Sequence, residues 1–237
     1  VDLVKGRDSG KDDNGHGTHV SGIIAGHGNN AAGVSGLCWT GSIVPVKFMN
    51  SKGKGSSSDA ATGLAYAIKA GAKIVNGSFG SSSKSSALAD QVSYAQKKGV
   101  LCVFAAGNNG TNNDSSATPI YPANFTNGNI IAVAAVTSTG ALASFSDYGP
   151  KMVDLGAPGD SILSTYLTSS YKVLSGTSMA SPIVAAAAAM IRQQNPALTY
   201  SQIRSAILSH TTPDAALQGK MVHPGVLDIA SALATLP

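Results

Sequence analysis

The sequence predicts one three-layer α/β domain over residues 1–237, with helices on both faces of a mostly parallel sheet. Short apolar runs rich in β-branched residues alternate along the chain with longer segments of helical periodicity. Hydrophobic residues make up 43% of the chain and charged residues 12%, which excludes a disordered protein. A chain of 237 residues is also long enough to bury a substantial core.

Five apolar runs bounded by glycine or polar residues are predicted as buried strands. They cover residues 43–49, 73–79, 100–106, 130–136 and 152–155. The active site of such a sheet lies at the carboxyl ends of its strands. Two of the predicted strands end in unusual polar sequences, Asn76-Gly77-Ser78 and Gly107-Asn108-Asn109, so we expect the site there.

Five segments between and after these strands are predicted as helices. They cover residues 59–70, 86–98, 179–194, 201–209 and 227–235. Ser58 or Asp59 is expected to cap the first helix, and Gly99 ends the second. The alanine-rich third helix is apolar on all sides, which predicts that it is buried.

Charge and cysteine content exclude several functional classes. The formal net charge is +4, but the basic residues are scattered and Lys97-Lys98 is the one adjacent pair, so we expect no nucleic-acid partner. No apolar run is long enough to cross a bilayer, and we expect no membrane partner. Cys38 and Cys102 lie in apolar surroundings and are predicted to be buried free thiols rather than a disulfide.

A serine opens the buried alanine-rich helix in the sequence Gly176-Thr177-Ser178-Met179-Ala180. The N-terminus of a helix carries free N–H groups and the positive end of the helix dipole. Ser178 there is well placed to act as a nucleophile beside a forming oxyanion. The alternative is that Ser178 is an ordinary N-cap, because serine caps are common.

A histidine opens a second small-residue helix in the sequence Asn14-Gly15-His16-Gly17-Thr18-His19. His16 and His19 have the spacing of a metal pair, but no glutamate lies between them as in the His-Glu-x-x-His zinc motif. A catalytic base is therefore the preferred interpretation of His16, and metal ligation the weaker one.

Together with Ala105-Ala106-Gly107-Asn108, these two motifs resemble those of the subtilisin family of serine proteases. In that family's reference enzyme, roughly 157 residues separate the catalytic histidine from the serine, and roughly 91 separate it from the oxyanion-hole asparagine. Here 162 positions separate His16 from Ser178, and 92 separate it from Asn108. The resemblance implies that Ser178 is the nucleophile of a secreted endopeptidase, His16 its general base and Asn108 a donor to the oxyanion.

The resemblance also implies where a peptide substrate binds. Two segments are expected to pair with an extended substrate as flanking strands, Ser78-Phe79-Gly80 and Lys54-Gly55-Ser56, although both could be ordinary surface loops. The P1 pocket should be lined by two segments, Ala105-Ala106-Gly107-Asn108 and Ser78-Phe79-Gly80. Ile120 falls where many relatives have a small residue, which predicts a shallow pocket, and a cis bond is expected at Tyr121-Pro122.

A structural calcium ion is a further implication of the resemblance. The loop that begins at Gly28 resembles the calcium loop of the family, and its oxygen donors would be Asn30 and the carbonyls of Gly28, Ala32 and Val34. The alternative is a plain turn rich in asparagine and glycine.

No aspartate stands where the family places its catalytic one. In the reference enzyme it precedes the histidine by roughly 32 residues. Asp8-Ser9-Gly10 matches the Asp-Ser-Gly sequence in which the family's aspartate can stand, but it follows a polar segment and lies only eight residues before His16. Asp2 is less suitable still. We therefore expect that the chain lacks the first strand with its aspartate, and that alone it is nearly inactive and poorly stable. The expected partners are peptide substrates, a pro-segment and the missing N-terminal segment, and the protein is expected to be a monomer.

Two other functions share part of this pattern. A protein of the same fold that binds peptides without cleaving them remains an alternative, although it has no need of Ser178, His16 and Asn108 together. An α/β-hydrolase esterase is excluded, because in that fold the serine precedes the histidine and the flanks read Gly-x-Ser-x-Gly.

Overall fold

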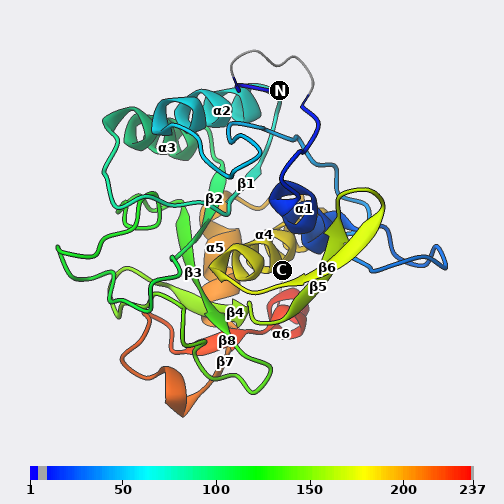
Figure 1. Cartoon of the computed structure of the whole chain (residues 1–237). Helices are drawn as coiled ribbons and strands as arrows, with labels where there is room; N and C mark the ends of the chain where they lie inside the picture. Colours follow the sequence, from blue (N-terminus) through cyan, green and yellow to red (C-terminus); the bar gives the residue numbers. More distant parts are fainter. Residues whose placement is uncertain (5–9, 236–237) are drawn as a thin grey trace.

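A mostly parallel sheet forms the centre of the molecule. The computed structural model describes residues 1–4 and 10–235, and Figure 1 shows the sheet between layers of helices. In the described residues the sheet has six strands in the order β1-β2-β3-β4-β8-β7. Neighbours are parallel from β1 to β8, and β7 pairs antiparallel with β8. The strands are β1 (Ile74–Gly77), β2 (Leu101–Ala105), β3 (Ile130–Val136), β4 (Leu155–Pro158), β8 (Gly225–Leu227) and β7 (Thr211–Pro213).

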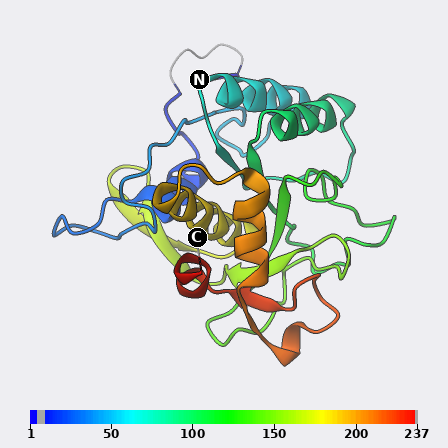
Figure 2. The same cartoon turned by 180° about the vertical axis from the view of Figure 1, so that it is seen from behind.

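Helices cover both faces of this sheet, as the sequence predicts. Figure 2 shows α5 and α6 on the side opposite α2 and α3. Alternate residues of β2 supply the two cores, because Leu101 and Val103 pack with α4 and α5 while Cys102 and Phe104 pack with α2 and α3. The helices are α2 (Ser57–Lys69), α3 (Ser86–Lys97), α4 (Thr177–Gln194), α5 (Tyr200–Ser209) and α6 (Ile229–Ala234), with a short 3₁₀ turn η1 (Ala215–Leu217).

A helix and a hairpin lie beside α4. Helix α1 (His16–Ala25) packs against α4 and against β5 (Ile162–Tyr166), which pairs antiparallel with β6 (Ser170–Leu174). Gly22 permits the close approach, because a Cβ there would overlap the hydroxyl oxygens of Ser164 and Thr165. Ser164 and Thr165 in turn donate hydrogen bonds to the carbonyls of His19 and Thr18, at 2.7 and 2.9 Å.

Several details differ from the sequence-based expectation. The predicted strand 43–49 is wrong: Lys47 and Met49 form single bridges, and Ile43 is exposed. The strand predicted at 152–155 begins at its last residue, Leu155, and the helix predicted at 227–235 begins after β8. The hairpin β5-β6 was not predicted, because its strands are only partly buried and lack a continuous apolar run.

Other details agree with the expectation. Cys38 and Cys102 are buried and free, and burial raises the pKa of Cys102 to about 12. One detail does not agree: the N-cap of α2 is Ser56 rather than the expected Ser58 or Asp59, and its hydroxyl accepts the Asp59 N–H. Among residues 1–4 and 10–235, no helix is long and apolar enough to span a bilayer.

Candidate active site

Ser178 lies in the first turn of the buried helix α4. The helix begins at Thr177, and the preceding Gly176 makes no side-chain cap. The N-cap interpretation of Ser178 is therefore wrong. Its hydroxyl is half-buried and donates to the Ser78 carbonyl at 3.3 Å, a weak bond that leaves the oxygen beside the helix N-terminus.

Ser78 ties the predicted substrate segment to the start of α4. Its hydroxyl donates to the Ser178 carbonyl at 2.9 Å and lies 3.0 Å from the Ser181 hydroxyl. The Asn76 amide donates to the Ser78 hydroxyl oxygen at 3.0 Å. The carboxyl end of β1 is thus fixed against Ser178, as its place in a parallel sheet predicts.

Asn108 is held with its amide nitrogen pointing outward. Its Oδ1 accepts the Thr177 N–H at 2.8 Å and the Thr177 hydroxyl at 3.0 Å. The Thr177 hydroxyl oxygen also accepts the Gly107 N–H at 3.1 Å. Because the oxygen is occupied, the orientation of the amide is fixed, and Nδ2 donates to none of the described residues. The side chain is exposed, so Nδ2 is open to a ligand.

Two N–H donors border one small volume beside Gly176. A Cβ built on Gly176 would lie 3.5 Å from Asn108 Nδ2, 3.6 Å from Asn108 Oδ1 and 3.7 Å from the Ser178 backbone nitrogen. An amide nitrogen and a backbone nitrogen this close together beside a serine hydroxyl are the groups that an oxyanion hole requires.

His16 is the first residue of α1, and α1 and α4 pack through Val20, Ile23 and Met179. Burial is the main cause that lowers the pKa of His16, the neighbouring His19 lowers it further, and the Asp12 carboxylate raises it. The His16 ring therefore favours the neutral form that a base requires. The ring makes no hydrogen bond to any residue within 1–4 or 10–235, and Asp8 lies outside the described residues.

His19 has a structural role instead of a metal-binding one. It is fully buried, and its Nε2 lies 3.1 Å from the Ile162 carbonyl and 2.9 Å from the Lys172 carbonyl. Two carbonyl partners require a proton on Nε2, so this nitrogen bridges both strands of the hairpin and is unavailable to a metal. In the described part of the chain, no group of three histidine, cysteine or acidic residues could hold a metal ion.

Ile120 lies close to Gly80 and Gly107, in the two segments predicted to line the P1 pocket. A Cβ on Gly80 would lie 2.6 Å from Ile120 Cγ2, and one on Gly107 would lie 3.0 Å from Ile120 Cγ1. Its side chain therefore lies between the two segments expected to line that pocket. Ala105 and Ala106 are core residues, so at most their backbone can reach a substrate. The bond before Pro122 is cis, as predicted.

The other predicted substrate segment is exposed but partly engaged. Lys54 donates its N–H to the Asn50 side chain at 3.2 Å and accepts the Asn50 N–H at 2.9 Å. Gly55 forms a single antiparallel bridge with Met49, and Ser56 caps α2. On the other segment, the Phe79 ring packs edge-on against Phe48 at 4.8 Å. Binding of peptide by Lys54, Gly55, Ser56 and Phe79 stays a prediction.

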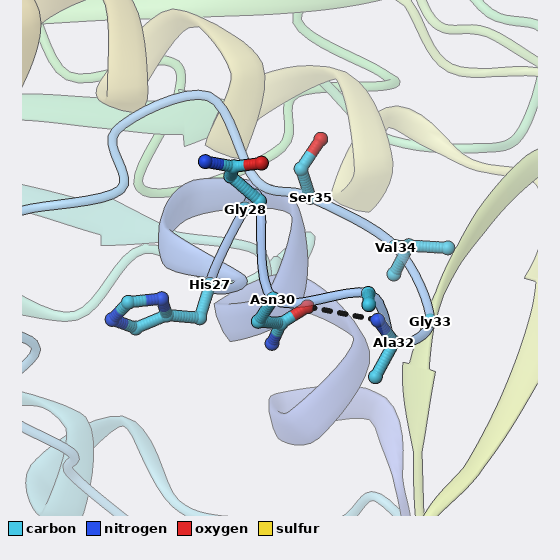
Figure 3. Close-up of a pocket in the computed structure, with 9 residues that line it drawn as sticks. His27, Gly28, Asn30, Ala32, Gly33, Val34 and Ser35 are labelled. Carbon is cyan, nitrogen blue, oxygen red and sulfur yellow. Dashed lines mark hydrogen bonds between the residues drawn. The ribbon is translucent and has the colours of Figure 1, made fainter.

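The predicted calcium loop lines a surface pocket formed by residues 27–35 (Figure 3). Asn30 Oδ1 already accepts the Ala32 N–H at 3.1 Å, and the loop contains no carboxylate. Gly28 and Gly33 are covered by Trp39 and Tyr171, whose atoms a Cβ would overlap. Calcium prefers several oxygens with negative charge among them, so this loop by itself does not fit the ion.

A serine at the N-terminus of a central buried helix, with two converging N–H donors, defines the class of α/β serine hydrolases. Comparison with known proteins narrows the class. The chain belongs to the subtilase family (Peptidase_S8), whose model matches residues 2–224.

Characterised relatives match most of this chain. Subtilisin Savinase of Lederbergia lenta is 43% identical over 210 residues, which are 89% of this chain and 75% of that protein. Thermitase of Thermoactinomyces vulgaris is 41% identical over 206 residues, 87% of this chain and 70% of that protein. The thermostable alkaline protease of Halalkalibacterium halodurans is 42% identical over 205 residues, 86% of this chain but 54% of that protein.

Two residues of the site gave no distinct signal in the sequence. Thr177 stands inside the recognised Gly-Thr-Ser motif, but its contact with Asn108 joins residues 69 positions apart. Asp147 is fully buried and binds the loop around Asn108, again across a long stretch of chain. Such partners meet only through the fold, so local patterns could not identify them.

Proposed function

We propose that the protein is a serine endopeptidase that cleaves peptide bonds through an acyl-enzyme. The observation that carries the proposal is the convergence of Asn108 Nδ2 and the Ser178 N–H beside Gly176. Members of its family that match this chain are named as subtilisins and alkaline proteases, which supports the same activity.

The proposed reaction begins when the Ser178 hydroxyl attacks the scissile carbonyl carbon. Its proton passes to neutral His16, and the carbonyl oxygen becomes an oxyanion held by Asn108 Nδ2 and the Ser178 N–H. Collapse expels the amine, which takes the proton from His16 and leaves an acyl-Ser178 ester. Water, deprotonated by His16, then repeats the attack and releases the acid.

The orienting carboxylate of His16 is not among the described residues. We expect the chain by itself to be slow, because loss of that hydrogen bond costs about 10⁴ in kcat in a serine protease triad. The same observation favours a second candidate, a peptide-binding protein that no longer cleaves.

A fluorophosphonate probe separates the two candidates. Only an activated Ser178 reacts with it, and Ser178→Ala is the control for labelling elsewhere. Labelling that disappears in Ser178→Ala supports the peptidase, and a chain that binds peptide yet stays unlabelled supports the binding protein.

We also propose a small P1 residue in the substrate, because Ile120 fills space between Gly80 and Gly107. Kinetics with peptides that differ only in P1 test this. Faster cleavage after alanine than after phenylalanine is expected, and a strong preference for phenylalanine would contradict it.

Secretion and a bound calcium ion are further proposals that follow from the family. A calcium ion at residues 28–34 would need a carboxylate from outside the loop. Equilibrium dialysis with calcium alone measures whether the chain binds the ion.

A further inference from the structure

Asp147 is a buried carboxylate whose partners are N–H and O–H groups rather than a cation. Its side chain is fully buried, and no ion pair links it to the described residues. Four donors satisfy it instead, which allows a carboxylate to be buried without a cation. They are the Asn109 N–H at 2.9 Å, the Asn109 amide at 3.2 Å, the Thr111 N–H at 2.8 Å and the Thr111 hydroxyl at 3.1 Å.

All four carboxylate bonds lie on the C-terminal side of Asn108 in the chain, and a backbone bond of the same residue lies on the other side. On one side, the Asp147 backbone N–H donates to the Gly107 carbonyl at 2.9 Å. On the other, the carboxylate accepts the Asn109 N–H. Asn108 itself is exposed and makes no contact with Asp147 that would hold it directly. Asp147 therefore fixes the peptide units that flank the oxyanion donor and leaves the donor free.

Gly107 fits closely against this carboxylate. A Cβ on Gly107 would overlap Asp147 Oδ2, and the residue has φ +121°, which disfavours other side chains. The turn and the carboxylate therefore form one fitted unit. A displacement of Asp147 would move the backbone that carries Asn108.

We propose that Asp147 is a positioning residue for the oxyanion hole, which sets the location of Asn108 Nδ2 through the backbone of residues 107–111. The inference rests on the proposed function. Oxyanion donors act because they are already in place when charge develops, so a displaced donor weakens transition-state binding more than substrate binding. The expected signature is a loss in kcat with KM nearly unchanged.

The Asn109 and Thr111 N–H groups can only donate, and both bond to Asp147 Oδ1. Asp147→Asn keeps an oxygen there, but it removes the negative charge and places an NH₂ group against the Asn109 amide, which must turn to present its oxygen. Thr111→Val is a milder second variant of similar shape that removes only the bond at 3.1 Å.

The test is a double-mutant cycle assayed with peptide p-nitroanilides. We expect Asp147→Asn to lower kcat roughly 10- to 100-fold, as a misplaced catalytic group does, with KM within about twofold. Thr111→Val should act in the same direction and less strongly. In an Asn108→Ala background, Asp147→Asn should have almost no further effect, because the donor it positions is gone.

Asp114→Asn is the matched control. Asp114 also accepts backbone N–H groups, those of Lys151 and Met152, but it makes no bond to residues 107–111. Its substitution should leave kcat unchanged even if the melting temperature falls.

Equal losses from Asp147→Asn in the wild-type and Asn108→Ala backgrounds would overturn the inference, and so would a rise in KM with kcat unchanged. Failure of the proposed function has a different signature: either the unsubstituted protein hydrolyses no peptide, or Asn108→Ala and Ser178→Ala leave hydrolysis intact.

Discussion

The two helix N-termini of the site differ in how firmly they hold their reactive side chains. At the start of α4, the Thr177 hydroxyl joins Gly107 to Asn108, and Ser78 binds the Ser178 carbonyl. At the start of α1, the His16 ring bonds to none of the described residues. The half of the site that would stabilise charge is thus preorganised, whereas no residue within 1–4 or 10–235 orients the ring that would move the proton.

The difference between the two helix N-termini indicates that we should expect proton transfer through His16, rather than stabilisation of the oxyanion, to limit the rate of this chain. Preorganised donors stabilise an oxyanion whether or not the base is oriented, and in serine proteases they leave a residual rate about 10³–10⁴ above water. We therefore expect the described residues to support that residual catalysis, with the remainder dependent on how His16 is held.

The largest predicted effect compares His16→Ala with Ser178→Ala. In subtilisin itself, loss of either group lowers kcat by about 2 × 10⁶. If about 10⁴ of this is already missing with the orienting carboxylate, His16→Ala should cost only about 10²-fold in this chain. Ester hydrolysis by the chain, by His16→Ala and by Ser178→Ala gives the ratio of kcat between the chain and each variant. A His16→Ala loss close to 10⁶ would mean that His16 is already fully oriented here.

A second prediction concerns Ile120 and the predicted P1 pocket. In Ile120→Gly, the space between Gly80 and Gly107 opens, so the ratio of kcat/KM for P1 phenylalanine to P1 alanine should rise roughly 10- to 100-fold. Ile43→Gly, on an exposed loop, is the control and should leave this ratio unchanged. No change in Ile120→Gly would place Ile120 outside the pocket.

A smaller effect is expected from Thr177→Val, which tests how Asn108 is held. The variant keeps the backbone bond to Asn108 Oδ1 but removes the hydroxyl bonds to Asn108 and Gly107. The loss of these two hydrogen bonds, at about 0.7 kcal/mol each, predicts a kcat about tenfold lower with KM unchanged. Thr62→Val removes a comparable hydroxyl bond on the exposed face of α2 and should not alter kcat. Equal effects from both variants would contradict the role of Thr177.

The sequence was most informative where function depends on local motifs. The segments Gly176-Thr177-Ser178 and Gly107-Asn108 predicted a nucleophile and an amide donor, and the described geometry brings the two segments together. The alternation of strands and helices also predicted both faces of the sheet, because buried strands and apolar helices have distinct patterns.

The sequence was less informative where the outcome depends on distant partners. Residues 43–49 have the apolar, β-branched composition of a strand but pair at single positions only. Asp147 resembles any loop aspartate until the fold places it under Asn109 and Thr111. The hairpin β5-β6 is half-exposed, so its alternation is too weak to stand out.

The last and smallest effect on activity concerns the influence of Asp12 on the pKa of His16. Asp12 raises the pKa of His16, and its carboxylate also caps α1 through the N–H groups of Asn14, Gly15 and Thr18. Asp12→Asn removes the negative charge, so the pKa of His16 should fall further. Because the base must be neutral, kcat/KM rises with pH through this pKa, and the acidic limb should move to lower pH. A limb that moves to higher pH, or does not move, would contradict the coupling.

The same substitution separates electrostatics from capping. Burial raises the pKa of Asp12, but the bonds from Gly15, Thr18 and Asn14 outweigh it and lower the pKa to about 2. A lowered carboxyl pKa stabilises the fold above the unfolded value of about 4, and this stability is lost as the pH falls towards 2. Asp12→Asn should therefore lower the free energy of unfolding at pH 7 by about 0.5–2 kcal/mol, the range for a helix cap, and by less at pH 2. Urea denaturation at both pH values measures the difference. An equal loss at both would assign the stabilisation to packing, and only the shift of the acidic limb would then report on His16.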